Sequence, residues 1–303
     1  MSNYSSSEFD KNNTNSSWYK ASRLIPIKSK VLDVGCSSGN FGAYLIDKRD
    51  CKVDGIELFE EDFKLSSKKL KKVWNLNVES DSLEGVDSDY DVIYMGDVIE
   101  HLVDPANALS KLKKLLNKNG FLVFSVPNMA NIMVRLHLLN GDFDYTETGI
   151  LDKTHLHFYT LKELERVINE GGMEIKKIDF VEKDLPNKLM DNILSKYGLK
   201  ASKEFYKLAH QPEAAAFQFV GIAKPNTGKP IKVKRGEFSP IDFFEDYHND
   251  ALSALGALKN KVKKLELECA ELEHELKVSQ GKTYPTDRIL QKVAKVARKI
   301  TRK

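Results

Sequence analysis

The sequence has few cysteines and no long apolar run. Three cysteines, Cys36, Cys51 and Cys269, occur among 303 residues, and their positions match neither a metal-binding nor a disulfide spacing. We therefore expect a protein of a reducing compartment such as the cytosol. No uninterrupted apolar run reaches the ~18 residues that a membrane span needs. The polar residues 1–16 contain no apolar signal core, so secretion is not expected either.

The chain also carries little net charge, although that charge is unevenly distributed. The formal net charge is +3. From residue 226 onward, 17 lysines and arginines stand against 11 acidic residues, an excess of six, so the preceding residues total −3. Nucleic-acid binding depends on a basic surface, which the first 225 residues do not offer. Nucleic acid is therefore not an expected partner.

Residues 31–42, VLDVGCSSGNFG, combine an apolar strand, a glycine turn and the start of a helix. Gly35 and Gly39 let the backbone approach a ligand closely, because no Cβ stands in the way. The free amide groups at the helix start point toward that ligand. The G-x-x-x-G spacing differs from the dinucleotide fingerprint. Asp33, at the end of the strand, favours a cationic ligand over a pyrophosphate.

Strand and helix patterns alternate along the first 225 residues, which predicts an α/β fold. We expect a Rossmann-like, doubly wound, mostly parallel seven-stranded sheet, with ligands at the carboxyl ends of the strands. The predicted strands are 31–34, 52–58, 75–79, 90–95, 121–126, 173–181 and 214–223, and the predicted helices are 18–24, 41–46, 60–73, 105–116 and 161–169.

The pattern Asp33-x-Gly35-x-x-x-Gly39 resembles motif I of class I S-adenosylmethionine (SAM)-dependent methyltransferases. The resemblance implies that the amino-acid end of SAM lies over the turn and that the strand-end carboxylate helps to position it. Asp33, Gly35, Cys36 and Gly39 are then cofactor-binding residues. An ordinary strand-to-helix turn of another Rossmann-like protein is the alternative that this motif alone leaves open.

Two more cofactor-binding positions follow the next predicted strands. Glu57 ends the second of them, 24 positions after Asp33. A carboxylate can accept hydrogen bonds from both hydroxyls of a ribose, and the resemblance implies that Glu57 binds the ribose of SAM. An ordinary loop acid is the alternative. In the resembled family, the position that Asn77 occupies has a side chain that commonly faces the adenine of SAM, with the amide of Val78 beside it.

The string GDVIEHLVDP, residues 96–105, directly follows the fourth predicted strand. It resembles the ubiquinone-type O-methyltransferases of class I, in which an acidic-x-x-Glu-His pattern at this place binds a divalent metal. The matching residues are Asp97, Glu100 and His101, which helical spacing would place within one turn. The alternative is a capping box, in which Asp97 and Glu100 satisfy free amides at a helix start. We expect no metal, and Asp97 as a cofactor-binding residue.

Residues 125–164, which include the string THLHF, resemble bacterial methyltransferases associated with surface-polysaccharide and glycolipid assembly. The segment would form a wall of the substrate site. His155 and His157 alternate on an extended stretch and would share a face. An imidazole can accept the proton of a sugar hydroxyl as the methyl group arrives. His101, His155 and His157 are therefore the catalytic candidates, and structural histidines bonded to backbone are the alternative.

The composition changes after residue 225. Residues 226–247, with prolines, glycines and lysines but few apolar residues, predict a linker. Residues 248–279 carry an a/d pattern over three heptads, which predicts a coiled coil and a dimer. A single helix packed on the first domain is the alternative. Residues 286–303 predict a basic amphipathic helix on an anionic membrane surface, with a nucleic-acid arm or a solvated helix as alternatives.

Together these patterns predict a SAM-dependent O-methyltransferase. Residues 17–225 would form its catalytic domain, with a helical insertion at 184–211, after a disordered tail at 1–16. The expected acceptor is a hydroxyl of a lipid-linked glycan or glycolipid, reached by a cytoplasmic protein at the inner face of the membrane, with glycan-assembly enzymes as partners. A ubiquinone-type enzyme acting on a quinol precursor and a non-catalytic SAM-binding scaffold are the alternatives.

Overall fold

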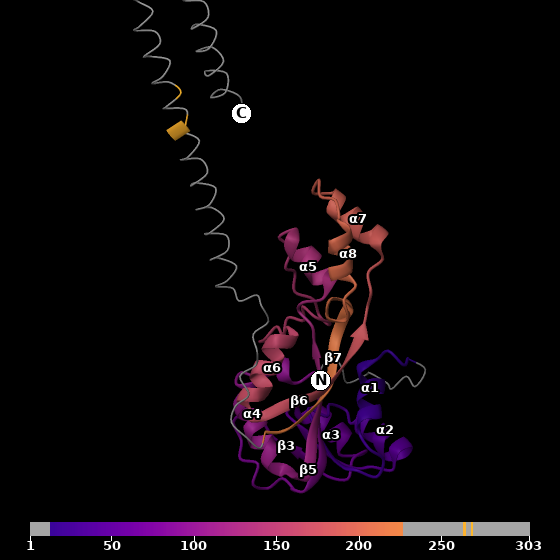
Figure 1. Ribbon diagram of the computed structural model, residues 1–303. Coiled ribbons are helices and arrows are strands. Elements are labelled where there is room, and N and C mark those ends of the chain that lie inside the picture. The colour runs from indigo at the N-terminus through magenta and orange to yellow at the C-terminus, as the bar shows by residue number, and fades with distance from the viewer. Residues whose placement is uncertain (1–12, 227–262, 265–267, 269–303) are drawn as a thin grey trace, which may run out of the picture. The chain divides into compact units, whose positions relative to one another are not determined.

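The computed structural model (Figure 1) describes residues 13–226, 263–264 and 268. Within these residues one sheet has the order β3-β2-β1-β4-β5-β7-β6. Strands β1 to β5 pair in parallel, and β7 runs antiparallel to both β5 and β6. The predicted mostly parallel seven-stranded sheet is thus confirmed. Its strands are β1 (Lys30–Val34), β2 (Lys52–Glu57), β3 (Val73–Asn75), β4 (Tyr90–Gly96), β5 (Leu116–Pro127), β6 (Met173–Glu182) and β7 (Ala216–Pro225).

Helices connect the strands and cover both faces of the sheet. The helices of the described residues are α1 (Ser17–Leu24), α2 (Asn40–Arg49), α3 (Glu60–Ser66), α4 (Pro105–Leu112), α5 (Ile132–Leu139), α6 (Leu161–Glu170), α7 (Asn187–Ser195), α8 (Lys203–Ala209) and α9 (Pro212–Ala215), with short 3₁₀ turns η1 (Ile99–His101) and η2 (Lys113–Leu115).

The alternation of side chains along each strand decides which helices cover which face. In β1, Leu32 and Val34 belong to the cluster that α4 and α6 cover, whereas Val31 belongs to the cluster with α1 and α2. In β4, Met95 belongs to the first of these clusters and Tyr94 to the second. A strand buried on both faces reads as a continuous apolar run, which is why these strands could be predicted.

A smaller apolar cluster joins α5 to α7 and α8, which lie together at one end of the domain in Figure 1. Ile132 and Leu136 of α5 contact the same cluster as Met190 and Leu194 of α7. Residues 184–211, expected as a helical insertion, contain α7 and α8. They pack on α5, in the segment that follows β5, so the insertion contacts part of the expected substrate wall.

Several element boundaries differ from prediction: β5 begins at Leu116 instead of residue 121, and the helix expected over 105–116 ends at Leu112. The helix expected over 60–73 ends at Ser66, because the following residues already bond to β2: Lys71 N donates to Val53 O at 3.2 Å. The third strand, expected over 75–79, is Val73–Asn75. The residues that follow it lead into a turn at 78–80, which the sequence analysis did not predict.

The N-terminal segment is ordered further than expected where the structure describes it. Residues 13–16 were assigned to a disordered tail, yet Asn15 Oδ1 accepts from Glu182 N at 3.1 Å. Ser16 accepts from Tyr19 N at 3.2 Å and caps α1. Residues 1–12 lie outside the described residues.

The predictions for the C-terminal part are not tested by the structure. The linker at 226–247, the coiled coil at 248–279 and the basic helix at 286–303 lie outside the described residues, apart from residues 226, 263–264 and 268. In the described parts, the helices are too short or too polar to cross a membrane.

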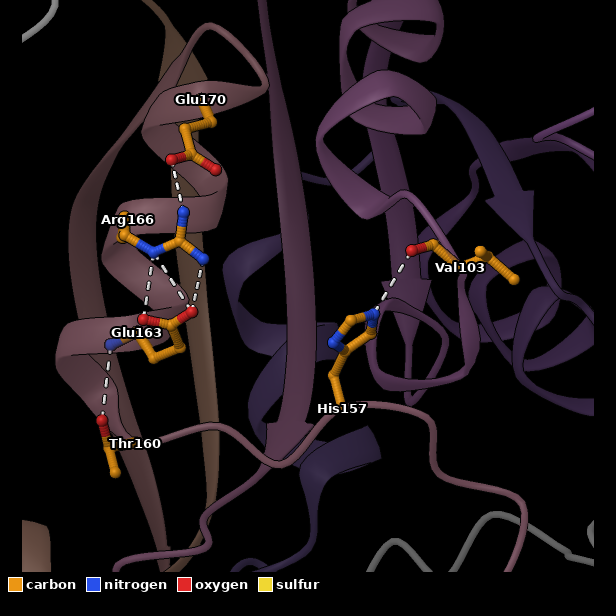
Figure 2. Close-up of polar contacts among 6 residues, drawn as sticks. All are labelled: Val103, His157, Thr160, Glu163, Arg166 and Glu170. Atoms are coloured by element: carbon orange, nitrogen blue, oxygen red, sulfur yellow. Dashed lines mark hydrogen bonds and ion pairs between the residues drawn. The ribbon is translucent and has the colours of Figure 1, made fainter.

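On α6, Arg166 lies between two glutamates, as Figure 2 shows. Its Nε donates to Glu163 Oε2 at 3.0 Å, and its Nη1 pairs with Glu170. The side chains of all three are exposed by 44–52%. Because such pairs are screened by water, we expect Arg166→Met to lower the free energy of unfolding by less than about 1 kcal/mol in urea denaturation. A loss above about 2 kcal/mol would contradict this.

Candidate active site

The turn between β1 and α2 has the conformation that its glycines predict. Gly35 and Gly39 have φ of 69° and 77°, a left-handed region that disfavours other residues. A Cβ on Gly35 would lie 2.7 Å from Val98 Cγ2, and one on Gly39 would lie 3.0 Å from Ser66 Cα. The turn therefore requires glycine at both positions. The contact with Val98 also brings the segment after β4 against this turn.

Asp33 lies beneath the turn with its carboxyl group nearly sealed from solvent. The residue is 3% exposed, and Oδ2 has no hydrogen-bond partner among the described residues. Burial, and then the nearby charge of Glu57, raise the pKa of Asp33 to about 7. A buried carboxylate without a partner is costly, so the charged form of Asp33 would be stabilised by a cation placed over the turn.

Glu57 ends β2, the strand that pairs with β1. Its Oε2 accepts from Ser37 N at 2.7 Å, and its Oε1 accepts from Phe59 N at 2.9 Å. Burial raises the pKa of Glu57, and these two backbone bonds oppose that rise. Each oxygen keeps a second lone pair. Glu57 therefore fixes the glycine turn and can still accept hydrogen bonds from a ligand.

Cys36 and the Asn77–Val78 pair have side chains that are largely engaged within the protein. The Cys36 side chain is 6% exposed and belongs to the apolar cluster with α1 and α2, and burial raises the pKa of its thiol. Only its backbone is available to a ligand at the turn. Asn77 lies in the turn after β3, where its Oδ1 accepts from Glu79 N at 2.8 Å. Val78 is 7% exposed and belongs to the core.

Asp97 follows β4 in a left-handed conformation, with φ of 55°. Its Oδ1 accepts from Ser125 Oγ at 3.1 Å, and it also accepts from Gln218 Nε2. The alternative of a capping box is wrong, because η1 is preceded by Val98, whose side chain makes no cap bond. Burial raises the pKa of Asp97. The carboxylate thus holds the ends of β4, β5 and β7 together instead of a helix start.

Glu100, in η1, is the most isolated polar group of the site. It is 1% exposed, and neither of its carboxylate oxygens has a hydrogen-bond partner among the described residues. Burial, and then the charge of Asp97, raise the pKa of Glu100 well above its usual value. A polar group left unpaired inside a protein costs free energy, so Glu100 calls for a functional explanation.

His101 and His155 lie beside Glu100. Their ring centroids are 4.8 Å apart in an edge-to-face arrangement. Nε2 of His155 lies 4.0 Å from Glu100 Oε1. Nδ1 of His155 lies 3.0 Å from Ile150 O, and Nδ1 of His101 lies 3.0 Å from Thr154 O. Burial lowers the pKa of His155, so its neutral form is favoured.

The chain bends between His155 and His157, so the expectation that the two side chains share a face of an extended stretch is wrong. Figure 2 shows His157 directed at the carbonyl of Val103, with Nε2 at 3.4 Å. Leu156 N and His157 N both donate to Glu100 O, at 2.9 and 3.1 Å. Two successive amides that share one acceptor require a bend, whereas an extended strand would alternate its side chains.

Sequence reasoning missed several residues that build the site. Asp152 is fully buried, and its Oδ1 accepts from Thr154 N at 2.8 Å and from Thr154 Oγ1 at 2.7 Å, which shapes the loop that presents His155. Ser125 and Gln218 position Asp97. Asp152 and Ser125 lie within residues 125–164, which the sequence analysis assigned to the substrate wall. Gln218 lies outside every motif, because β7 reaches the site only through its antiparallel pairing with β5.

A comparison with known families decides the identity of this domain. The family described as "Methyltransferase domain" matches residues 12–178, which is more than half of the chain. The chain belongs to this methyltransferase family. The predicted SAM-dependent methyltransferase domain and its cofactor SAM are thereby confirmed at the level of the family.

Curated relatives of this methyltransferase include three proteins named ubiquinone biosynthesis O-methyltransferase. The one from Nitrosospira multiformis is 23% identical over 153 residues, which are 49% of this chain and 64% of the relative. The one from Neisseria meningitidis is 27% identical, over 48% of this chain and 64% of the relative. The one from Burkholderia pseudomallei is 26% identical, over 56% and 74%. The chain thus spans less than two thirds of the first two relatives.

Solved structures similar to this methyltransferase include two SAM-dependent methyltransferases. The one from Archaeoglobus fulgidus has a TM-score of 0.48 at 19% identity and covers 68% of this chain and 92% of its own. The TehB-like one from Corynebacterium glutamicum has a TM-score of 0.43 at 15% identity, over 69% and 87%. Likeness at this level concerns the fold alone.

Proposed function

We propose that this methyltransferase transfers the methyl group of SAM to a hydroxyl group of a lipid-linked glycan or a glycolipid. The observation that carries the methyl-transfer part of the proposal is the close approach of Val98 to Gly35, which brings two parts of the site together. On one side of the contact is the glycine turn with its carboxylates. On the other side are Glu100 and His101, in the turn that follows Val98.

The two carboxylates suit the two ends of SAM. Asp33, under the turn, attracts the ammonium group at the amino-acid end of SAM, because opposite charges attract strongly where water is excluded. Glu57, at the tip of the neighbouring strand, accepts from the ribose hydroxyls with the lone pairs that Ser37 N and Phe59 N leave free. Asp97 is a further cofactor-binding residue in this proposal.

Methyl transfer from a sulfonium to a hydroxyl oxygen needs alignment and the removal of one proton. With hydrogen on Nδ1, which faces a backbone carbonyl, each of His101 and His155 keeps a lone pair on Nε2. His101 is half-buried and therefore more accessible to a substrate than buried His155. We assign the proton transfer to His101, and the ring of His155 packs against it. Nε2 of His157, the third candidate, instead lies 3.4 Å from the carbonyl oxygen of Val103.

The sequence patterns after residue 225 support the proposed acceptor and location. Residues 286–303 would bring the enzyme to an anionic membrane surface, and residues 248–279 would join two copies as a dimer. The protein would act in the cytoplasm, at the inner face of the membrane, beside glycan-assembly enzymes. The names of the curated relatives favour a second candidate, the O-methylation of a quinol precursor.

Methyl-labelled SAM, supplied to the full chain with isolated membranes, tests the acceptor. We expect label in lipid-linked glycan or glycolipid, with release of S-adenosylhomocysteine. Label in a quinol fraction would instead support the second candidate. Binding of SAM without any release of S-adenosylhomocysteine, from membrane or cytosolic extracts, would favour a scaffold role and overturn the proposed activity.

A further inference from the structure

We propose that Tyr94, in β4, is a further SAM-binding residue whose hydroxyl oxygen accepts a hydrogen bond from the ammonium group of the cofactor. This assignment rests on the proposed function, because it adds a residue to the same cofactor site. Tyr94 belongs to no motif and lies inside a strand that reads as a continuous apolar run. The ring of Tyr94 fits such a run, whereas its hydroxyl group requires a separate explanation.

The hydroxyl group of Tyr94 is buried and has no hydrogen-bond partner among the described residues. The residue is 3% exposed and belongs to the apolar cluster with α1 and α2. Its ring packs against Phe41, with the ring centroids 4.4 Å apart. A hydroxyl group buried without a partner costs free energy, and phenylalanine would give the same ring packing without that cost. The hydroxyl group therefore points to a ligand that supplies the partner.

The backbone of Gly96 leaves space for this hydroxyl group at the carboxyl end of β4. Residues two positions apart in a strand face the same side of the sheet, and Gly96 is the last residue of β4. A Cβ on Gly96 would overlap the Tyr94 hydroxyl group and lie 2.5 Å from Tyr94 Cζ. Any other residue at position 96 would displace the hydroxyl group from the edge of the sheet at which ligands bind.

Tyr94 and Asp33 are neighbours in the sheet. They are paired residues of the parallel strands β4 and β1, so their side chains lie on the same face. The pairing continues for one more residue, after which β1 enters the glycine turn and β4 reaches Gly96. Tyr94 Oη and Asp33 Oδ2, both without hydrogen-bond partners among the described residues, are thus on neighbouring strands below one ligand site.

The charges near Tyr94 decide which part of SAM its hydroxyl group can bind. Burial, and then the charges of Asp97 and Asp33, raise the pKa of Tyr94 well above its usual value, so the phenol stays neutral. Ser125 opposes this rise, although its hydroxyl group is not in hydrogen-bonding geometry with Tyr94. Carboxylates at this place repel the carboxylate of SAM and attract its ammonium group.

A neutral hydroxyl group can bind a cation and a carboxylate at once, because it donates one hydrogen and accepts through its oxygen lone pairs. An ammonium group carries three hydrogens, so Asp33 and Tyr94 can each accept one of them. With its own hydrogen directed at a carboxylate, Tyr94 presents a lone pair to the ammonium group. Tyr94 thereby adds direction to an attraction that Asp33 supplies through its charge.

Calorimetric titration of the full chain with two ligands tests this assignment. One ligand is S-adenosylhomocysteine, and the other is its analogue that lacks only the amino group. We expect Tyr94→Phe to weaken the binding of S-adenosylhomocysteine about tenfold, because it removes a hydrogen bond to a charged donor. The affinity for the analogue should stay within twofold. An unchanged affinity for S-adenosylhomocysteine, or an equal loss for both ligands, would overturn the assignment.

Tyr159→Phe is the matched control. Tyr159 is 2% exposed, and its hydroxyl group also has no hydrogen-bond partner among the described residues. It belongs, however, to the cluster that α4 and α6 cover. We expect Tyr159→Phe to leave the affinity for S-adenosylhomocysteine within twofold. A similar loss of affinity in both variants would contradict a specific contact between Tyr94 and the cofactor.

Urea denaturation without ligand separates a ligand contact from a structural one. Removing a buried hydroxyl group that has no partner should leave the free energy of unfolding unchanged or raise it. We therefore expect Tyr94→Phe to bind S-adenosylhomocysteine more weakly although the free protein is no less stable. A lower stability of Tyr94→Phe would show that the hydroxyl group bonds within the protein, and would refute the assignment.

The titrations also separate this assignment from the proposed function. If the unaltered chain binds no S-adenosylhomocysteine, the cofactor site as a whole is wrong, and Tyr94 with it. If the unaltered chain binds S-adenosylhomocysteine and Tyr94→Phe binds it equally well, the cofactor site stands and only the role of Tyr94 is wrong.

Discussion

Glu57→Gln is expected to weaken the binding of SAM by about 100-fold, because hydrogen bonds to a charged acceptor contribute about 1.5–3 kcal/mol each. The structure gives Glu57 a second role besides the proposed contact with the ribose. Both carboxylate oxygens accept backbone hydrogens, from Ser37 and Phe59. An amide must turn its NH₂ group toward one of those N–H groups, so the substitution also disturbs the glycine turn.

Calorimetric titration with SAM measures this loss, and Glu84→Gln provides the control. Glu84 is an exposed glutamate on the segment before β4, so the same chemical change there should leave the affinity within twofold. We also expect Glu57→Gln to lower the free energy of unfolding by about 1–3 kcal/mol, because a buried donor loses its partner. Unchanged affinity in Glu57→Gln would remove Glu57 from the cofactor site.

The affinity for SAM should rise with pH up to about 7, by about tenfold per pH unit. The reason is the buried carboxyl of Asp33, whose pKa is raised to about 7. A cationic ligand prefers the charged form of Asp33, so below pH 7 binding has to release a proton. Titrations from pH 5.5 to 7.5 measure this slope, in a range below the titration of the amino group of SAM.

The same group makes the opposite prediction for the free protein. The folded state keeps the proton of Asp33 up to about pH 7, whereas the unfolded chain loses it near the ordinary value of 3.8. Between these values the folded state binds more protons, so its stability falls as the pH rises, by at most about 1.4 kcal/mol per pH unit. Below about pH 4 this contribution is fully present, and it is lost above about pH 7.

Asp33→Asn is the variant that tests both dependences. We expect it to bind SAM weakly at every pH and to remove the contribution of Asp33 to both slopes. Asp89→Asn, at an exposed aspartate, should keep both slopes. A pH dependence of SAM binding that persists in Asp33→Asn would assign the titration to another group, such as Glu57, whose pKa is also raised.

The strands of the sheet could be predicted because burial on both faces leaves a continuous apolar pattern in the sequence. Val31 and Leu32 are fully buried on opposite faces of β1, and Tyr90 and Val92 are fully buried in β4. The exception is β3, an edge strand of three residues, Val73–Asn75, that is only partly buried. A strand so short leaves too few apolar positions to set its boundaries, and Asn77 was misplaced as a result.

The glycine turn and its two carboxylates could be predicted from the amino-acid sequence alone. Left-handed Gly35 and Gly39 and the strand-end positions of Asp33 and Glu57 follow from local backbone geometry and from the parallel order of β1 and β2. Such features are encoded within a few residues of each other, so a pattern in the chain is enough to reveal them.

The side chains that meet beside that turn could not be predicted without the folded structure. It separated Asp97 from Glu100 by giving Asp97 the partners Ser125 and Gln218, and it brought His155 next to His101 across 54 positions of the chain. Contacts of that kind depend on how a loop bends over a sheet and on where an antiparallel strand returns. The spacing of residues along the chain does not predict such contacts, because the side chains that meet are held by hydrogen bonds between segments far apart in the sequence.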